Sequence, residues 1–229
     1  MHLPFIPVPD VVRTQASAVA RGLVDADVPV AVFTLSGPPS TTPVGVASFD
    51  TKALAKQILS DSPARLVAFE PTGYLAAFFS APAVVYRDEL RYPLPAQHRQ
   101  PWISVEDQAA LAIAALERPD LAGRWFRIGE QDTGPELADG ISAGLGRTIR
   151  YVPLDPGEFG ASLAPVMGPE LGAQLAADYR MLGSRPTELD LDADTSEIRK
   201  ELGVKVTPLA EWARAQDWQA AAAMLGAPS

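Results

Sequence analysis

The feature that most constrains the fold is a set of short apolar runs separated by helical patterns. Residues 28–37, VPVAVFTLSG, are almost continuously apolar and end in Ser and Gly. Such a run is typical of a strand buried on both faces of a parallel sheet, because a half-exposed strand alternates apolar and polar residues. Residues 65–74 predict a second buried strand, broken by Pro71, and residues 124–129 predict a third.

Helical patterns lie between these strands. Residues 10–25 predict a helix with Asp10 as its N-cap, and residues 49–60 predict a helix whose apolar residues recur at i and i+4. Lys52 then lies in the first turn of the second helix. Strands that alternate with helices predict an α/β fold, doubly wound, with a mostly parallel sheet.

The chain divides into two parts on this pattern. Residues 1–130 predict an α/β unit, in which residues 80–101 form an irregular excursion that contains several prolines. Residues 131–229 predict a smaller, α-rich C-terminal lobe. Before the first helix, residues 3–8 predict a short strand whose prolines suit the edge of a sheet better than its centre.

Composition argues against several classes of partner and site. The net charge of −9 and the pI of about 4.7, with no cluster of Lys and Arg, argue against nucleic acid or an anionic membrane as partner. There are no cysteines, and His2 and His98 are far apart, so no thiolate or histidine metal site is expected. The N-terminus does not resemble a signal peptide, and no apolar run reaches the roughly 18 residues of a membrane span, so we expect a cytoplasmic protein.

Six segments resemble, in order, those of the NmrA-like branch of the atypical short-chain dehydrogenase/reductase superfamily. They are VAVFTLSG, FDTKALAK, LVAFEPTGYLAAF, the block from PWISVED to RWFRIG, ELADGISAGLGRTIRYVPLDPGEF and PLAEWARAQ. No single motif is specific, but the ordered set covers most of the chain. The resemblance implies that residues 1–130 form part of a Rossmann-type NAD(P)-binding domain, that residues 131–229 form a substrate lobe, and that the cofactor is NADP or NAD.

One motif of the family is not found. The cofactor is gripped there by a Gly-rich turn after the first strand, yet none of the 17 glycines gives a G-x-G-x-x-G or G-x-x-G-x-x-G pattern between a strand and a helix. The chain resembles the family from its fourth strand onward, which implies an N-terminally truncated sheet with residues 3–8 as an open edge. Three explanations stay open: a start codon placed too late, pairing of this edge with a second copy in a homo-oligomer, or a degenerate remnant.

Lys52 matches the family lysine that reaches the nicotinamide ribose, where an ammonium group can donate to both hydroxyls. The alternative is an exposed lysine without a role. Four residues earlier, Ser48 stands in place of the phenol acid of typical short-chain dehydrogenases, so no dedicated proton donor is expected there. Lys56 stands where the family often has Glu, which removes a helical ion pair, and Glu70 stands where many relatives have Arg.

Two further segments match the nicotinamide side of the family's site. Thr34 and Ser36 end a central strand at the carboxyl edge, where such sheets bind ligands. A turn after the next strand matches the turn beside the nicotinamide, where Gly allows close approach of the backbone. Its residues are Pro71, Thr72, Gly73 and Tyr74. Plain turn formers and a strand terminator are the respective alternatives.

Aromatic residues could line an apolar substrate pocket between the two lobes, with an ordinary place in the core as the alternative. The candidates are Tyr74, Phe78 and Trp102. Asp107 matches a frequent acid of the family, but its spacing from Ser104 indicates a capping box that accounts for it. The acidic residues 188–194 lack the Gly and Glu of a calcium loop and predict a solvated turn.

The resemblance implies an NAD(P)H-dependent oxidoreductase that hands hydride to a small apolar substrate of quinone, azo or carbonyl type. The alternatives are a non-catalytic regulator that senses the dinucleotide, and a remnant with little cofactor affinity that serves as an interaction module. Because the chain has no Gly-rich turn, we expect these 229 residues to bind NADPH weakly or not at all.

Overall fold

The computed structural model describes most of the chain. It covers residues 8–37, 43–80, 87–184, 191, 193 and 195–219, with residues 78–80 and 166–167 described by their backbone alone. Three predictions fall outside this part of the chain: the strand at residues 3–8, the side chain of Phe78 and most of the acidic segment 188–194. Pairing of the edge strand with a second copy therefore stays a prediction. Within the described ranges, no helix is long and apolar enough to cross a membrane.

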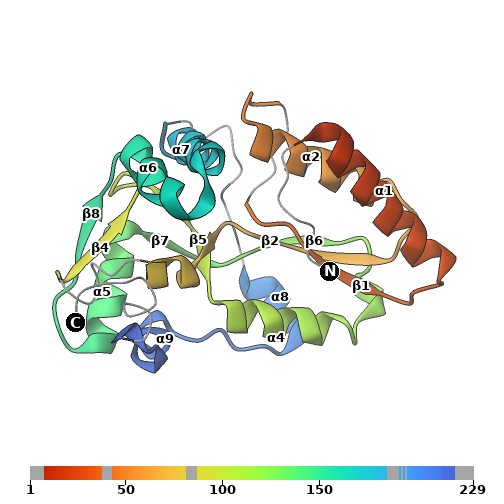
Figure 1. The fold of residues 1–229 in the computed structure, drawn as a ribbon. Coiled ribbons are helices and arrows are strands. Elements are labelled where there is room, and N and C mark those ends of the chain that lie inside the picture. The colour runs from red at the N-terminus through yellow and green to blue at the C-terminus, as the bar shows by residue number, and fades with distance from the viewer. Residues whose placement is uncertain are drawn as a thin grey trace.

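A parallel three-stranded sheet forms the centre of one half of the molecule. Its order is β1–β2–β6, with β1 at Ala31–Thr34, β2 at Leu66–Pro71 and β6 at Trp125–Ile128. One face is covered by α1 (Pro9–Asp25) and α2 (Ala47–Ser60), and the other by α4 (Val105–Ala115) and α8 (Thr195–Leu202) (Figure 1). This arrangement confirms the predicted doubly wound α/β fold.

β2 is the strand that matches the prediction of burial on both faces. All six of its residues are buried, and β1 and β6 pair with it on either side. β1 is buried less completely, because among the described strands it pairs with β2 alone. Its Phe33 packs with Ala16 of α1 and Leu59 of α2 in one core cluster. The apolar run at residues 28–37 therefore overstates the burial of β1.

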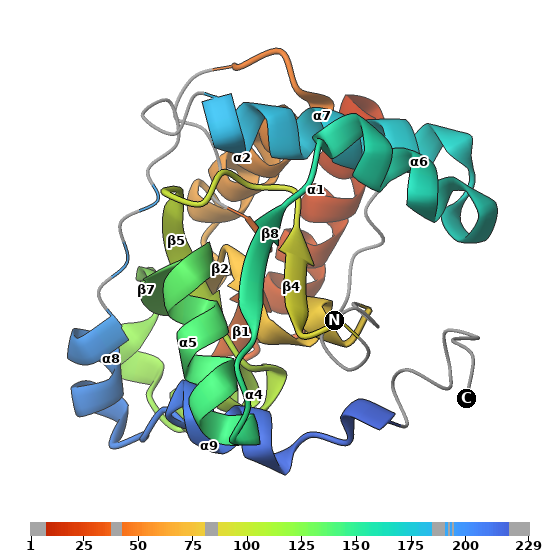
Figure 2. The same ribbon diagram turned by 90° about the vertical axis from the view of Figure 1, so that its left-hand side faces the viewer.

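The other half combines helices with short strands. β4 (Glu89–Tyr92) pairs in parallel with β8 (Arg150–Pro153), and β5 (Arg99–Ile103) lies between β3 (Gly73–Tyr74) and β7 (Glu130–Thr133). The helices of this half are α5 (Gly134–Leu145), α6 (Pro156–Met167), α7 (Pro169–Ser184) and α9 (Leu209–Ala215), of which α7 lies beside α2 (Figures 1 and 2). Short 3-10 helices span Leu75–Ser80 and Pro119–Leu121.

The prediction of an irregular excursion over residues 80–101 is wrong at two places in the described part of that segment. β4 and the start of β5 lie within it. β4 pairs with β8 much later in the chain, with Leu90 opposite Tyr151. A four-residue strand with a distant partner leaves no periodic pattern of its own, and the prolines that follow it suggest a loop. The ladder also joins a segment of the predicted first domain to the predicted C-terminal lobe.

α1 begins one residue earlier than predicted. It starts at Pro9, so Val8 is the N-cap and Asp10 belongs to the first turn. Proline suits the first helical position because its missing N–H would have no partner there in any case. The interpretation of Asp10 as N-cap is therefore wrong.

α2 also begins earlier, at Ala47, which places Lys52 in the second turn and not the first. The carboxylate of Asp50 accepts hydrogen bonds from the backbone N–H groups of Val44 (2.8 Å) and Gly45 (3.1 Å). These bonds hold the chain that enters the helix. The ammonium group of Lys52 is consequently removed from the positive end of the helix dipole, whose effect is confined to the first turn.

Asp107 has two roles at the start of α4. Its backbone N–H donates to the hydroxyl of the N-cap Ser104 at 3.0 Å, which confirms half of the predicted capping box. Its buried carboxylate, however, accepts hydrogen bonds from Thr207, from the backbone N–H at 3.2 Å and from Oγ1 at 2.9 Å. Helix capping therefore accounts for the backbone of Asp107 only, and the side chain fastens the segment before α9 to α4.

We expect Asp107→Ala to lower the free energy of unfolding by about 2–3 kcal/mol, because it leaves two donors of Thr207 without their acceptor. Asp107→Asn, which keeps an amide oxygen as acceptor, should cost less. The exposed neighbour Glu106 is the matched control, and Glu106→Ala should change stability by no more than about 0.5 kcal/mol. Urea denaturation of the three variants measures this. Equal effects of Asp107→Ala and Glu106→Ala would show that the contact with Thr207 adds nothing.

Candidate functional site

The carboxyl ends of β1 and β2 bring two predicted site segments together. The backbone N–H of Leu35 donates to the carbonyl of Phe69 at 2.9 Å, and that of Gly37 donates to the carbonyl of Pro71 at 2.6 Å. The chain leaving β1, with Thr34 and Ser36, therefore lies directly beside the turn that leaves β2. This is the edge at which parallel sheets bind ligands.

Lys52 reaches the same edge from α2. Gly37 has a φ of +80°, and a Cβ built on it would lie 2.9 Å from Lys52 Nζ. The side chain is half-buried, so the alternative of a fully exposed lysine does not hold. Burial lowers the pKa of Lys52 to about 8, and the negative charge of Asp178 opposes this shift. The ammonium group therefore loses its proton at a lower pH than an exposed lysine does.

Gln108 of α4 joins the other two predicted residues at this edge. Its amide Nε2 donates to Thr34 Oγ1 at 3.2 Å, and the same side chain hydrogen-bonds the phenol of Tyr74. Burial raises the pKa of Tyr74 to about 12 despite this hydrogen bond, so the phenol stays protonated. Nothing in the sequence singles out Gln108, since a glutamine within a helix gives no signal of a distant partner.

Gly73 is required by a neighbouring side chain. A Cβ at this position would lie 2.5 Å from the ring of Trp102, which is 5% exposed and packs edge-on against Tyr92 at 5.3 Å between ring centroids. Trp102 therefore offers little surface to a ligand, and its place in a substrate pocket stays a prediction. The adjacent Thr72 Oγ1 is buried and has no hydrogen-bond partner among the described residues.

Ser48, four residues before Lys52 on α2, is fully buried. Its hydroxyl donates a short hydrogen bond to Asp178 of α7, which lies 130 residues later in the chain. Gln174 Nε2 donates to the same carboxylate oxygen at 2.8 Å. Burial raises the pKa of Asp178, while these two hydrogen bonds and the charge of Lys52 lower it. Ser48 therefore connects the two halves of the molecule and has no surface on which to meet a substrate.

Lys56 of α2 and Glu70 of β2 form one ion pair. Lys56 Nζ lies 2.8 Å from Glu70 Oε1, and Glu70 is 2% exposed in the middle of the sheet. The ammonium group also lies 4.9 Å from the ring centroid of Trp125, and Arg127 Nε lies 4.0 Å from the other carboxylate oxygen. Lys56 therefore makes no ion pair along α2 with Lys52, and instead pairs across to β2.

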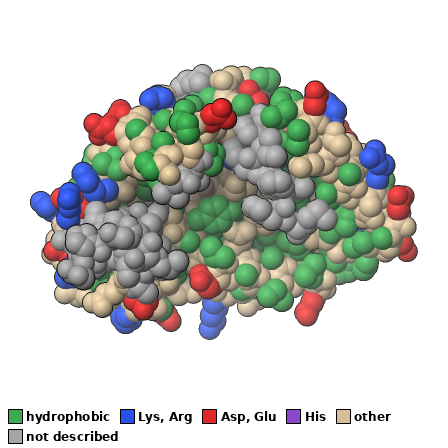
Figure 3. Space-filling view, in the orientation of Figure 1, with side chains coloured by type: hydrophobic (Ala, Val, Ile, Leu, Met, Phe, Trp, Pro, Cys, Tyr) green, Lys and Arg blue, Asp and Glu red, His purple; other side chains and the backbone are tan. Residues whose placement is uncertain are grey.

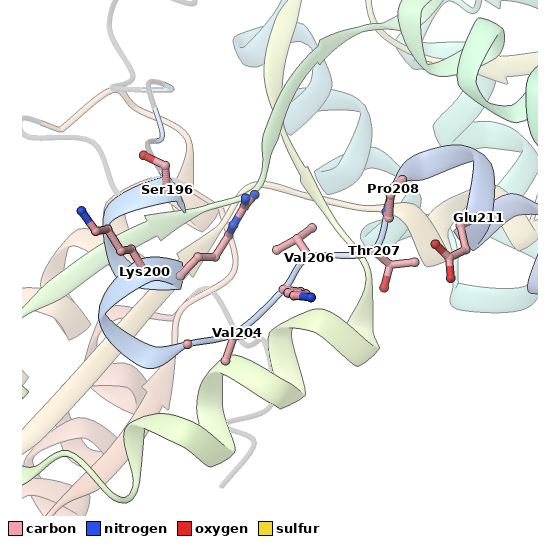
Figure 4. A pocket seen from close by; sticks show the side chains of 10 residues that line it. Ser196, Lys200, Val204, Val206, Thr207, Pro208 and Glu211 are labelled. Carbon is pink, nitrogen blue, oxygen red and sulfur yellow. The ribbon is translucent and has the colours of Figure 1, made fainter.

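Other features do not compete with this edge as a site. A cavity of ≈ 660 Å³ lies between α8 and α9, where Val206 and Thr207 form part of its wall (Figure 4). Its Arg199 is paired with Glu130 at 2.6 Å. In the described part of the chain, no three His, Cys, Asp or Glu side chains are placed to hold a metal ion. Figure 3 shows a hollow between the α6–α7 side and the α1–α2 side, with hydrophobic side chains at its base.

We expect the pair between Lys56 and Glu70 to show strong coupling in a double-mutant cycle. Lys56→Met leaves a buried carboxylate without its nearest cation and should cost about 2 kcal/mol of unfolding free energy. Glu70→Met should cost less, because Lys56 is partly exposed to solvent. The double variant should lie within about 1 kcal/mol of the original protein. Losses that simply add in the double variant would contradict the pairing.

We expect Lys52→Met to change the pH dependence of stability. In the folded protein Lys52 releases its proton near pH 8, whereas in the unfolded chain it holds the proton to about pH 10.5. Between these values the unfolded state binds more protons, so the stability of the original protein rises with pH by about 1 kcal/mol per unit relative to Lys52→Met. Urea denaturation from pH 7 to 10 measures this difference, with exposed Lys200→Met as control. If the difference in unfolding free energy between the original protein and Lys52→Met does not change with pH, the pKa of Lys52 is not lowered in the folded protein.

Comparison with known proteins gives matches at the level of structure. No protein-family model and no curated protein matches the sequence. A nucleoside-diphosphate-sugar epimerase from Staphylococcus aureus superposes with a TM-score of 0.73, at 20% identity, over 93% of this chain and 75% of its own. NmrA, a negative transcriptional regulator solved with NADP, gives a TM-score of 0.67 at 17% identity. The match covers 90% of this chain and 73% of NmrA.

Two reductases show the same likeness. An NADPH-dependent quinone oxidoreductase from Escherichia coli gives a TM-score of 0.66 at 20% identity, covering 90% of this chain and 78% of its own. A Citrobacter triphenylmethane reductase solved with NADP(H) gives a TM-score of 0.68 at 15% identity. The match covers 89% of this chain and 70% of the reductase. The chain therefore has the fold of NmrA and of these Rossmann-type NADP-binding reductases, as the ordered sequence segments predicted.

Proposed function

We propose that this chain is an NmrA-like protein of the NAD(P)H-dependent oxidoreductase type, whose site lies at the carboxyl ends of β1 and β2. The observation that carries the proposal is the placement of Lys52 Nζ against Gly37, beside the turn of residues 71–74. A cation that is half-buried at a ligand-binding edge, with its pKa lowered to about 8, is a candidate for function.

The donors at this edge fit the nicotinamide end of a dinucleotide. Lys52 would donate to the ribose hydroxyls, and the hydroxyl of Thr72, which has no partner among the described residues, could pair with a polar group of the ligand. When bound, the reduced nicotinamide would supply the hydride. For the pyrophosphate the fit is poorer, since the chain contains no Gly-rich turn between a strand and a helix.

The residues near Lys52 favour a quinone-like substrate over a simple carbonyl. Reduction of a carbonyl produces an alkoxide that needs a nearby acid, whereas hydride transfer to a quinone produces a delocalised phenolate that can take its proton from water. Ser48 is fully buried beneath α7 and cannot reach a substrate. The high pKa of Tyr74 makes its phenol a hydrogen-bond donor but a poor acid. The hydrophobic base of the neighbouring hollow suits a small apolar molecule (Figure 3).

The second candidate is a non-catalytic protein that senses the dinucleotide. It is favoured by the same burial of Ser48, because a sensor needs ligand contacts and no acid. Oxidation of NADPH in the presence of a small benzoquinone separates the two. Turnover that Lys52→Ala lowers supports the oxidoreductase, and dinucleotide binding without turnover supports the sensor.

We expect NADPH and reduced nicotinamide mononucleotide to bind with similar, weak affinity, within about threefold of each other or 0.6 kcal/mol. Both carry the nicotinamide ribose that Lys52 would contact, and the adenosine half of NADPH meets no Gly-rich turn. Titration followed by NMR measures the two dissociation constants.

Lys52→Ala should lower the affinity for each ligand about tenfold. The exposed control Lys200→Ala should leave both affinities unchanged. Low-micromolar binding of NADPH together with much weaker binding of the mononucleotide would show that the chain holds an adenosine or pyrophosphate site. No binding of either ligand would contradict the proposed function.

A further inference from the structure

The cavity between α8 and α9 is separate from the edge that carries Lys52. α8, which forms one of its walls, covers the α4 side of the parallel sheet, whereas α2 with Lys52 covers the opposite side (Figure 1). The volume of ≈ 660 Å³ is within the range of ordinary ligand pockets, about 300–1,000 Å³. The remaining walls come from α9 and from the connection between the two helices (Figure 4). The proposed dinucleotide site leaves this cavity unused.

The acidic and basic side chains of α8 are sorted between two faces of the helix. Glu197 and Glu201 both pair with Arg124, at 2.9 Å each, and neither lines the cavity. Residues four apart share a face of a helix, so one partner can hold both carboxylates. Arg199 and Lys200, in contrast, line the cavity. The helix therefore presents its cations to the cavity, while its carboxylates are neutralised elsewhere.

The cavity wall carries an excess of positive charge in a chain whose net charge is −9. Lys205, from the connection after α8, adds a third cation, and Glu211 of α9 is the single carboxylate among the described lining residues. Arg199 is paired with Glu130 at 2.6 Å, whereas Lys200 and Lys205 form no ion pair within the described part of the chain. Two exposed ammonium groups are thus left to attract an anionic group.

The connection from α8 to α9 has the sequence of a strand but pairs with no strand. Residues 204–207, Val-Lys-Val-Thr, alternate apolar and polar side chains and are rich in β-branched residues, a pattern typical of strands. They belong to none of the described sheets, and Figure 4 shows them outstretched between the two helices. A segment of this kind can pair with a strand from another chain.

Hydrogen bonds hold both ends of this segment. The backbone N–H of Val204 donates to the carbonyl of Arg199 at 3.0 Å, and that of Thr207 donates to the carboxylate of Asp107 at 3.2 Å. Between these two residues, the backbone N–H groups of Lys205 and Val206 have no partner among the described residues. Because the ends are fixed, the segment needs little further ordering when a partner binds, which lowers the entropic cost of association.

We propose that the cavity between α8 and α9 binds an extended, acidic segment of a partner protein, which adds as a strand along residues 204–207. Backbone hydrogen bonds to this segment give affinity, and Asp or Glu side chains that meet Lys200 and Lys205 give specificity. A small anion would meet the same lysines, but it has no backbone to pair with residues 204–207. The site is independent of the dinucleotide site, and neither requires the other.

Titration of the full chain with synthetic octapeptides tests this site. The probe alternates Glu and Val and has blocked ends, and its counterpart alternates Lys and Val. We expect the acidic peptide to bind with a dissociation constant on the order of 10⁻⁴ M, at least about tenfold more tightly than the basic one. Its affinity should fall as the salt concentration rises, because the lysines are exposed.

Hydrogen exchange of the backbone amides shows how the peptide binds. Strand addition should slow exchange at Lys205 or Val206 about tenfold or more when the acidic peptide is at saturation. If inorganic phosphate displaces the peptide and neither amide is protected, the cavity binds a small anion only, and strand addition is wrong. Absence of binding at millimolar peptide, or equal binding of the basic peptide, overturns the proposal.

A charge reversal in the cavity wall and a matched control complete the test. Lys205→Glu should lower the affinity for the acidic peptide about tenfold or more. Arg21→Glu reverses an exposed cation on α1 and should leave this affinity unchanged. Neither variant should change the binding of reduced nicotinamide mononucleotide, so failure of the dinucleotide proposal leaves this one standing. Equal effects of the two variants on peptide binding would show that the peptide responds to net charge alone, which contradicts a site at this cavity.

Discussion

The buried carboxylate of Glu70 is the constraint on which the geometry of the site depends. It lies in β2, whose six residues are all buried between β1 and β6, and a charge in such a place must be paired. Lys56 of α2 provides the nearest cation. Residues four apart lie on the same face of a helix, so the pair that turns Lys56 toward the sheet also turns Lys52 toward Gly37. A contact within the core thereby sets the direction of the lysine at the surface edge.

The second half of the molecule completes this edge from the other side. α7 meets α2 through Asp178 and meets β4 through Tyr179, and the aromatic contacts continue to Trp102 above Gly73. Ser48, four residues before Lys52, joins the two halves of the molecule through its hydrogen bond to Asp178. The burial of Ser48 fits the proposed function, which needs no acid from the chain.

Local patterns were sufficient to predict much of the fold. The runs at residues 65–74 and 124–129 gave β2 and β6, and the i,i+4 pattern at residues 49–60 gave α2, because each pattern reflects burial against an adjacent element. The errors concern contacts between residues far apart in the chain. β4 pairs with β8, Asp178 meets Ser48, and Gln108 meets Thr34. Helical spacing addresses only the pair between residues 52 and 56, whereas the partner of Lys56 is Glu70 in a strand.

The central claim is that Lys52 and the turn at residues 71–74 meet the nicotinamide end of a dinucleotide. Saturation-transfer NMR of NADPH with this chain tests it directly, since the transfer reports which ligand protons lie against the protein. The account predicts the strongest transfer to the nicotinamide ring and its ribose, reduced in Lys52→Ala, with weak transfer to adenine. Transfer strongest at adenine, or unchanged at the nicotinamide in Lys52→Ala, would contradict it.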